Sequence, residues 1–226
     1  IAADFRENGK LVVYRDTQAF VAARRQMDLQ RRLGGPQQHA LGPADVLSVE
    51  PALAEAAARL VGAIHTPGEC VADCRATCEQ LAQRLASRGV RFVLGERVKS
   101  FRIAGGRILS ACLASGEIEA DAFVVASGTG SARLAQALGL RLPVYPLKGY
   151  SITLDIAPPD RVPQASITDA ARKIVLARIG SQVRVAGRAE LVGDDLSIPA
   201  SRIATLAHAA QELFPGACDL ANLRPW

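Results

Sequence analysis

A glycine turn that follows an apolar run offers the first residues that could bind a ligand. Residues 123–126 are apolar and largely aromatic or β-branched, which predicts a buried strand, and Ser-Gly-Thr-Gly follows at 127–130. Ser131 is a candidate N-cap for a helix that ends at Gly139. Glycines let backbone N–H groups approach a phosphate, and the start of a helix carries partial positive charge. The segment predicts either a phosphate cradle or a tight turn without a ligand.

This turn departs from the dinucleotide-binding fingerprint G-x-G-x-x-G. Gly128 and Gly130 supply the first two glycines, but Arg133 stands in the place of the third. No acidic residue follows at the spacing of about 20 residues at which such folds bind a ribose. The motif alone therefore leaves both interpretations open.

Three of the five cysteines recur at every fourth residue. Cys70, Cys74 and Cys78 would share one face of a helix, and three thiolates could bind a metal. However, the spacing is not the paired C-x-x-C of zinc sites, and only His65 is a nearby candidate for a fourth ligand. Gly68 also favours a loop at Cys70.

The last of these cysteines has a simpler interpretation as core. Cys78 continues an apolar stripe with Leu81, Ala82 and Leu85 on the expected helix. The odd number of cysteines, with no secretory signal in the sequence, indicates reduced thiols in a cytoplasmic setting. We therefore predict that the protein has no metal site.

Composition indicates a globular protein whose positive charge is dispersed. The 226 residues are 49% hydrophobic and 22% charged, with a formal net charge of +5. No apolar run approaches the roughly 20 residues that span a bilayer, so we predict no transmembrane helix. Basic residues adjoin only at 24–25, 31–32 and 172–173, and aromatic residues are only 4%. Because nucleic-acid binding needs clustered cations and stacking rings, we predict no nucleic-acid partner.

The elements that position these residues alternate between strands and helices. Periodicity and turn residues predict strands at 10–15, 61–65, 90–94, 97–104, 107–114, 121–126, 148–156, 173–179 and 182–188. Helices are predicted at 17–33, 43–50, 73–88, 131–139 and 201–213. Asp73 is the expected N-cap of the third helix, and Gly105 and Gly106 join two strands in a hairpin.

Long strands flank a central cluster of helix, hairpin and apolar strand. We predict a nucleotide-binding α/β layer at 73–142 and an antiparallel sheet assembled from 1–72 and 143–226. The expected fold class is therefore α/β, with an α+β part that contains the antiparallel sheet.

Two long motifs resemble a known flavoprotein family. The sequences VYPLKGYS at 144–151 and RVAGRAELVG at 184–193 are similar to the small subunit of bacterial D-amino acid dehydrogenases, with further matches at 8–11, 49–53, 73–74, 169 and 173–174. The resemblance implies the fold of D-amino acid oxidase-like flavoenzymes. Residues 1–72 and 143–226 would form the substrate domain, and 73–142 the second part of an FAD-binding domain.

The resemblance also implies the chemistry and the cofactor contacts. A D-amino acid would be oxidised to an imino acid, which hydrolyses to a 2-oxo acid and ammonia, with FAD as hydride acceptor and a respiratory-chain quinone as the final electron acceptor. Val98 would supply a backbone contact to the adenine, and Ala126, Ser127 and Gly128 would contact the flavin nucleotide. The implied location is cytoplasmic, with peripheral attachment to the inner membrane as an alternative.

Four residues of the predicted sheet domain are implied as substrate contacts. They are Lys148, Tyr150, Lys173 and Arg188. For Lys148 and Arg188 the alternative is an exposed basic side chain on a strand, and for Tyr150 it is a packing role. No catalytic residue is identified.

Two parts of the family pattern are missing from this sequence. In family members the glycine turn that binds the FAD pyrophosphate precedes the position of Ile1. Arg224 superficially matches the carboxylate-binding arginine of W-T-G-L-R-P, but counting from Pro215 aligns Trp226 with the tryptophan of that motif. Arg224 is therefore not expected to bind substrate.

We accordingly expect a fragment of an FAD-dependent D-amino acid dehydrogenase that is inactive in isolation. The strand and turn at 121–130 should form, and FAD should be absent from the isolated chain. Two alternatives stay open: a flavoenzyme similar to glycine or sarcosine oxidase, and a non-catalytic binding or assembly module.

Overall fold

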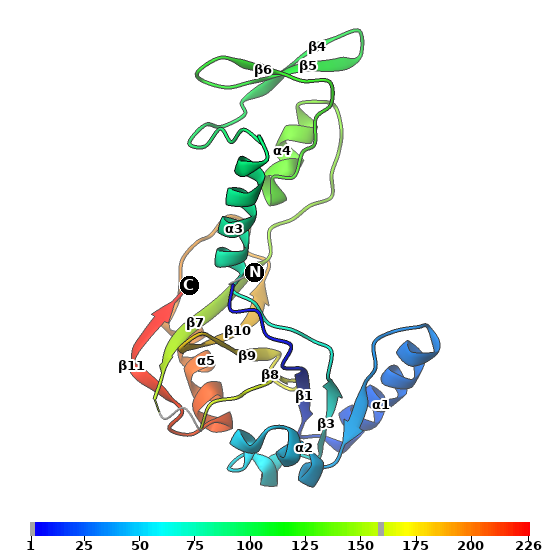
Figure 1. The fold of residues 1–226 in the computed structure, drawn as a ribbon, viewed down its shortest axis with the longest axis vertical. Helices are drawn as coiled ribbons and strands as arrows, with labels where there is room; N and C mark the ends of the chain where they lie inside the picture. Colours follow the sequence, from blue (N-terminus) through cyan, green and yellow to red (C-terminus); the bar gives the residue numbers. More distant parts are fainter. Residues whose placement is uncertain (1–2, 158–160) are drawn as a thin grey trace. The chain divides into compact units, whose positions relative to one another are not determined.

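The computed structural model describes residues 3–157 and 161–226, which form a mixed α/β fold (Figure 1). The chain divides into two compact units. The first comprises Ile1–Ala82, Lys148–Glu190 and Leu196–Trp226, and the second comprises Gln83–Leu147 and Leu191–Asp195.

An eight-stranded sheet is the centre of the first unit. Its strands lie in the order β11-β7-β10-β9-β8-β1-β3-β2. They are β1 (Lys10–Tyr14), β2 (His39–Leu41), β3 (Gly62–Thr66), β7 (Lys148–Ile156), β8 (Ser166–Asp169), β9 (Ile174–Ile179), β10 (Gln182–Glu190) and β11 (Cys218–Pro225). Neighbours are antiparallel except β1 and β8, which are parallel, so the sheet is mixed where the sequence predicted an antiparallel one. The sequence between β1 and β8 is long enough to allow this parallel pairing.

The register of the sheet gives it two different faces. Buried cross-strand neighbours on β1, β8, β9, β10 and β7 form one row: Leu11, Ile167, Leu176, Val185 and Ile152. Because side chains alternate along a strand, the next row points to the opposite side. That second row is Val12, Thr168, Val175, Ala186 and Ser151. We call the first side the core face and the second side the open face, since Val175 on it is 37% exposed.

Helix α5 (Ala200–Leu213) covers the core face, as its apolar spacing predicts. Leu206 and Leu213 lie seven residues apart on one helix face, and both are fully buried. Truncating a fully buried leucine such as Leu206 to alanine typically costs ~2–5 kcal/mol. Shorter helices complete this core: α2 (Pro43–Val49), η1 (Pro51–Leu53) and η2 (Ala57–Arg59). They bury Val46 and Leu53 in the same cluster.

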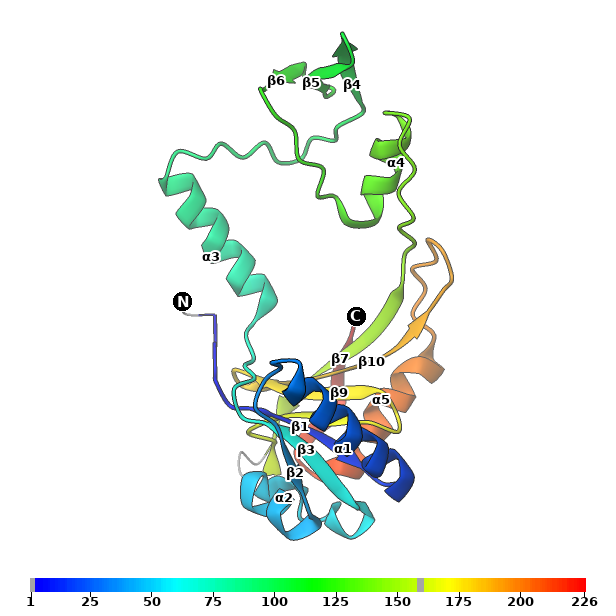
Figure 2. The ribbon, with the colours of Figure 1, turned by 90° about the vertical axis from the view of Figure 1, so that its right-hand side faces the viewer.

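Helix α1 (Thr17–Arg32) lies on the open-face side. Asp16 is its N-cap and accepts a hydrogen bond from the Ala19 N–H at 2.7 Å. The Phe20 ring lies 5.6 Å from the Tyr14 ring and closes over Gly62, where a Cβ would come within 2.6 Å of it. Figure 2 shows α1 and α5 on opposite sides of the strands. None of the side chains of α1 is buried.

The second unit contains a small antiparallel sheet and a short helix. The sheet order is β4 (Ser100–Ala104), β5 (Arg107–Cys112) and β6 (Glu117–Glu119). Gly105 and Gly106 have φ of 57° and 74°, which confirms the predicted hairpin turn.

Helix α3 (Cys74–Ser87) begins in the first unit. Asp73 caps it, as predicted, by accepting a hydrogen bond from the Ala76 N–H at 3.0 Å.

Two predicted strands of the second unit do not form. Residues 90–94 and 121–126 have no regular secondary structure, although their compositions are typical of strands. A strand needs a hydrogen-bonded neighbour, and within residues 3–157 and 161–226 no strand pairs with either run. Val124 is 90% exposed. The prediction for 121–130 was therefore right for the turn and wrong for the strand.

Three local predictions around helices were also wrong. Ser131 does not cap α4 (Ser131–Gln136); instead its Oγ accepts from the Ser127 N–H at 2.9 Å, and the N-cap is Gly130. This helix ends before Gly139, because Ala137 already closes its last turn. Cys78 is exposed rather than part of a core, since α3 buries none of its side chains.

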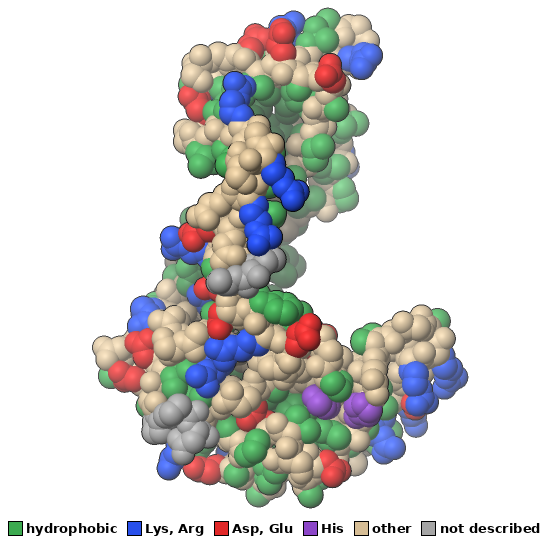
Figure 3. Space-filling view, viewed as in Figure 1, with side chains coloured by type: hydrophobic (Ala, Val, Ile, Leu, Met, Phe, Trp, Pro, Cys, Tyr) green, Lys and Arg blue, Asp and Glu red, His purple; other side chains and the backbone are tan. Residues whose placement is uncertain are grey.

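Charged side chains are spread over the surface, with a group of basic residues on α1 (Figure 3). The exposed arginines of that helix are Arg24, Arg25, Arg31 and Arg32. Arg31 pairs with Asp28 at 3.2 Å, one turn earlier in the helix. Among the described helices, none is long and apolar enough to cross a lipid bilayer.

Candidate active site

Lys173 and Arg188 line one hollow on the open face of the large sheet. The hollow has a volume of about 710 Å³, and the open-face residues Val175 and Ala186 form part of its wall. Its remaining lining residues are Arg172, Gly187, Ala189 and Glu190. The structure thus brings together two of the four predicted substrate contacts, from the turn before β9 and from β10.

Both basic residues have a backbone conformation that is rare outside glycine. Lys173 and Arg188 each have φ of 57°, in the left-handed region. Such a conformation costs on the order of 1–3 kcal/mol and persists only where surrounding structure enforces it. At Arg188 the cause is a bulge, because the register with β7 shifts between Gly187 and Ala189. The bulge takes Arg188 out of the regular alternation of β10.

Gly187 allows the two strained segments to pack closely. A Cβ on this residue would lie 2.7 Å from Ile174 Cγ1 and 3.0 Å from the Lys173 carbonyl oxygen. Real Cβ atoms do not come this close to neighbours, so a side chain here would push β9 and β10 apart. Gly187 is therefore part of the architecture of the hollow.

The charge of the hollow favours an anion. Lys173 and Arg188 line it together with the carboxylate of Glu190, while the third cationic lining residue, Arg172, is paired with Asp169 and Glu212. Glu190 already has two partners: the Tyr150 hydroxyl donates to it at 2.7 Å, and Arg202 of α5 forms an ion pair at 2.6 Å. The hydrogen bond from Tyr150 and the charge of Arg202 lower the pKa of Glu190. The carboxylate is thereby held in its ionised form.

The other two predicted substrate contacts lie outside this hollow. Tyr150 is 3% exposed and lies two residues before Ile152 on β7, so its ring is on the same side of the sheet, the core face. The Lys148 ammonium lies 5.3 Å from the centre of that ring, in cation–π geometry. Glu190 connects the two clusters, because it binds Tyr150 and also lines the hollow.

A second hollow lies beside the first and shares Lys173 with it. It has a volume of about 580 Å³ between α1 and the strands β1 and β8. Small residues of α1, together with Val12, Tyr14 and Thr168, form much of its lining. Thr168 Oγ1 and Ser151 Oγ on the open face are buried and have no hydrogen-bond partner among the described residues. Buried hydroxyls usually have partners, so these two are available for a polar ligand on this face.

The second unit has a hollow of its own at the glycine turn. Val98, Ser127, Gly130 and Leu134 line it with Glu96, Arg97 and Arg133, and its volume is about 440 Å³. The turn is a short 3₁₀ segment, η3 (Gly128–Gly130), that follows directly after Ser127. Two of the predicted cofactor contacts, Val98 and Ser127, are thus brought to one place.

Gly128 gives this turn an accessible backbone. Its φ of 55° is left-handed, and a Cβ built on it would meet no atom within 4 Å. The open space lets a ligand come close to the main chain, as glycine-rich nucleotide-binding turns require. Ala126 and Gly128 flank Ser127 in sequence but do not line the hollow.

The cysteines are not arranged as a metal site. All five are free, and Cys70, Cys74 and Cys78 are exposed. Across residues 3–157 and 161–226, no three His, Cys, Asp or Glu side chains are grouped so that they could hold a metal ion. Burial raises the pKa of Cys218 to about 11, which keeps this thiol protonated and unreactive.

Comparison with known families identifies the fold. Residues 1–226 match the DAO family, described as FAD dependent oxidoreductase. The chain belongs to this family. Its mixed sheet, small antiparallel sheet and glycine turn agree with the α/β fold class predicted from the sequence.

Two relatives in the DAO family are similar along the whole chain. A protein named D-amino acid dehydrogenase 2 from Ralstonia nicotianae is 44% identical over 237 residues, which are 100% of this chain and 55% of the relative. The protein of the same name from Pseudomonas aeruginosa is 44% identical over 230 residues, 98% of this chain and 53% of the relative. The chain therefore spans about half the length of these relatives.

Solved structures of DAO-type enzymes share the fold. Glycine oxidase from Geobacillus kaustophilus superimposes with a TM-score of 0.86 at 25% identity and covers 100% of this chain and 60% of that one. L-proline dehydrogenase from P. horikoshii has a TM-score of 0.86 at 17% identity, with 98% and 60% coverage. The second likeness supports the fold alone.

The residues at the glycine turn fit part of an FAD site. An open backbone at Gly128 suits the approach of a nucleotide, and the guanidinium groups of Arg97 and Arg133 suit its phosphates. These residues, with Val98 and Ser127, could hold one portion of the cofactor.

Several residues of the candidate site were not found from the sequence. Glu190, Thr168 and Ser151 carry no individual signal, because their importance depends on cross-strand neighbours. Glu190 lies within the RVAGRAELVG motif, and Ser151 ends VYPLKGYS, so both motifs include residues of this region. Arg224 forms a bidentate pair with Asp155, at 2.7 and 2.9 Å. That its guanidinium does not bind substrate stays a prediction.

Proposed function

We propose that the chain is part of an FAD-dependent dehydrogenase that oxidises D-amino acids. The main support for this proposal is the 44% identity, along 98–100% of the chain, to relatives named D-amino acid dehydrogenase 2. When bound, FAD supplies the acceptor for the hydride that leaves the substrate Cα. The resulting imino acid reacts with water to give a 2-oxo acid and ammonia. The first unit corresponds to the substrate domain, and the second to part of the cofactor domain.

Lys173 and Arg188 bind the carboxylate of the substrate in this proposal. They line one hollow with the Glu190 carboxylate, which is already bound by Tyr150 and Arg202. A carboxylate held by two cations fixes the position of the neighbouring Cα, which is the atom that must be aligned with the cofactor. Arg188 provides fork-shaped hydrogen bonds, and Lys173 provides a point charge.

Lys148 and Tyr150 support the substrate site through Glu190. The Tyr150 hydroxyl holds the Glu190 carboxylate, and the Lys148 ammonium lies against the Tyr150 ring. Glu190 forms one wall of the hollow, so its position determines the charge that a substrate meets. These two residues are therefore assigned an indirect role in substrate binding.

The glycine turn contributes the cofactor contacts of the second unit. Val98 and Ser127 line the hollow there, and Ala126 and Gly128 place the main chain of the turn beside it. Backbone N–H groups at such a turn bind nucleotide oxygen atoms without a side chain.

The electron acceptor separates two candidate functions. We assign a respiratory-chain quinone, at a protein attached peripherally to the inner membrane, because the relatives at 44% identity are named dehydrogenases. An oxidase that passes electrons to oxygen is the second candidate, favoured by the likeness to glycine oxidase at a TM-score of 0.86 and 25% identity.

Steady-state kinetics of the full-length flavoprotein test the function. A dehydrogenase reduces an artificial dye or a short-chain quinone with D-alanine and consumes little oxygen, whereas an oxidase forms hydrogen peroxide at a similar rate. The variants Lys173→Met and Arg188→Met should each raise KM for D-alanine about tenfold or more, as expected when a charged hydrogen bond is lost. Arg184→Met, on the same strand, is the matched control and should leave KM unchanged. Full activity in a K173M/R188M double variant would refute the carboxylate site.

A further inference from the structure

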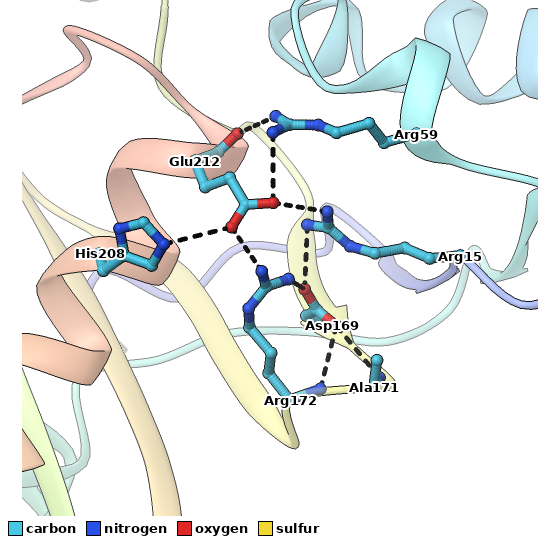
Figure 4. Close-up of polar contacts among 7 residues, drawn as sticks. All are labelled: Arg15, Arg59, Asp169, Ala171, Arg172, His208 and Glu212. Atoms are coloured by element: carbon cyan, nitrogen blue, oxygen red, sulfur yellow. Dashed lines mark hydrogen bonds and ion pairs between the residues drawn. The ribbon is translucent and has the colours of Figure 1, made fainter.

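An ionic network on the core face joins Glu212 to Asp169 and Arg172 (Figure 4), and Lys173 follows Arg172 in the same turn. Glu212 of α5 is bound by arginines from three different elements. Its Oε1 lies 2.7 Å from Arg15 and 3.2 Å from Arg59, and its Oε2 accepts from Arg172. The network therefore connects α5 to η2, to the end of β1 and to the β8–β9 turn.

Asp169 is the second acidic centre of the network. Arg172 and Arg15 bind its Oδ2 at 2.8 and 3.2 Å, and its side chain is 0% exposed. Burial by itself would raise the pKa of Asp169, but hydrogen bonds from Arg172 and the charges of Arg15 and Arg172 outweigh it and lower the pKa. Glu212 shows the same balance, with Arg15 as its main partner. Both carboxylates are therefore ionised near neutral pH.

The main-chain contacts of Asp169 determine the shape of the turn. Its Oδ1 accepts hydrogen bonds from the N–H groups of Ala171 and Arg172, both at 3.1 Å. Its carbonyl oxygen accepts from the Lys173 N–H at 2.9 Å. One fully buried residue thus binds three successive N–H groups, and the last belongs to the strained Lys173. A left-handed lysine is stable only if its surroundings leave it no relaxed alternative.

The network is a poor candidate for stability alone. Buried ion pairs often contribute no more to folding than apolar residues of the same volume, because desolvation offsets their attraction. Their best-attested benefit is a unique geometry. Here the geometry that they specify is that of the Lys173 turn at the edge of the substrate hollow.

We propose that Glu212 and Asp169 are positioning residues for the Lys173 ammonium at the substrate-carboxylate site. Glu212 fixes the Arg172 guanidinium, Arg172 fixes Asp169, and Asp169 holds the turn. The inference rests on the proposed function, since it assigns a purpose to the position of Lys173. In this arrangement, Glu212 and Asp169 on the core face control substrate affinity from the opposite side of the sheet.

A double-mutant cycle between Glu212 and Lys173 in the full-length flavoprotein tests the inference. Glu212→Gln keeps the size of the side chain and removes its charge. If Glu212 acts through Lys173, E212Q should raise KM for D-alanine about threefold to tenfold while kcat changes by less than about twofold, because ground-state and transition-state binding are lost together. In a K173M background, E212Q should then change KM no further.

Two control variants distinguish a change in the position of Lys173 from a general loss of fold stability. Leu206→Ala removes core packing from α5 without touching the network, and it should lower the melting temperature but leave KM unchanged. Glu55→Gln removes an exposed carboxylate that lies 3.9 Å from Arg161 and should change neither quantity. Calorimetric titration with anthranilate, an unreactive amino-carboxylate, gives a readout independent of turnover: its affinity should fall in E212Q and stay at the wild-type value in L206A.

The outcomes distinguish this inference from the proposed function. If K173M alone leaves KM unchanged, the carboxylate site itself is wrong and the inference fails with it. If K173M raises KM but E212Q raises it by the same factor in both backgrounds, Glu212 does not act through Lys173. If E212Q does not fold, Arg172→Lys replaces it, because lysine keeps the charge but cannot bridge two carboxylates. An unchanged KM in R172K would then overturn the inference.

Discussion

Lys173 and Arg188 share one left-handed backbone conformation, each with φ of 57°, and both line the hollow at the bulged end of β10. One strained cationic residue would be unremarkable, but two that face the same space indicate a site selected for binding at some cost to stability.

Relief of strain at Arg188 should separate stability from binding. Glycine adopts a left-handed φ freely, so Arg188→Gly relieves backbone strain in the folded protein, but it also gives the unfolded chain more conformational freedom. Because the two effects oppose each other, the free energy of unfolding should change by no more than about 1 kcal/mol. Arg184→Gly, at a regular position of the same strand, should be destabilising by ~0.5–1 kcal/mol. Denaturant titration measures both, and KM for D-alanine should rise only in R188G. A larger stability loss in R188G than in R184G would contradict the strain argument.

A methyl group at Gly187 should disrupt the hollow through packing. The new Cβ would lie 2.7 Å from Ile174 Cγ1 and 3.0 Å from the Lys173 carbonyl, so Gly187→Ala should be destabilising by ~1–3 kcal/mol. Gly149→Ala is the matched control, because its Cβ would find its nearest neighbour at 3.8 Å, in ordinary contact. Thermal unfolding of the two variants checks the prediction, which fails if they melt at the same temperature.

The glycine turn of the second unit should matter for the cofactor more than for the fold. Gly128 has φ of 55° in open space, so Gly128→Ala should reduce stability by only ~1 kcal/mol, the cost of a left-handed alanine. The added methyl group would project into the space through which a nucleotide approaches the main chain. Flavin bound per full-length protein should therefore fall in G128A and stay normal in Gly105→Ala, a matched left-handed glycine with φ of 57° in open space at the β4–β5 turn. Equal flavin content in both variants would remove Gly128 from the site.

Acid should weaken the network around Asp169 and Glu212. The pKa of each carboxyl is lower in the folded protein than in the unfolded chain, where it is about 4. The stability that they contribute is therefore present above that pH and is lost as the pH falls through the folded-state values. Between about pH 6 and pH 3, wild type should lose more stability than E212Q, while E55Q should follow wild type. Parallel curves for wild type and E212Q would mean that Glu212 is not stabilised in its ionised form.

The parts of the fold with strong local patterns could be predicted from the sequence. Alternation in β7 and β10 and the apolar stripe of α5 place those elements correctly, because each buries one face against its neighbours. Residues 90–94 and 121–126 could not be placed, since a strand depends on a partner that composition does not reveal. Strand β11 was missed because it contains Asp219 and Asn222, which strands disfavour.

The sequence singles out residues of the candidate site but does not indicate how they are grouped. Lys173 and Arg188 were singled out from motifs, yet no pattern in the sequence indicates that both have left-handed backbones. Tyr150 was predicted as a substrate contact with packing as the alternative, and no sequence pattern indicates the hydrogen bond from its hydroxyl to Glu190. Glu212 gave no signal at all, because its link to Lys173 runs through Arg172 and Asp169, which are distant from Glu212 in the sequence.

Anaerobic reduction of the flavin by substrate tests the central claim most directly. Full-length protein with bound FAD is mixed with D-alanine in the absence of oxygen, and the flavin absorbance is followed. In a D-amino acid dehydrogenase, D-alanine should abolish the absorbance of the oxidised flavin completely, and L-alanine should leave it unchanged. The K173M variant should require about tenfold more D-alanine for the same rate of flavin reduction. Flavin that stays oxidised with D-alanine, or that is reduced equally by both enantiomers, would contradict the account.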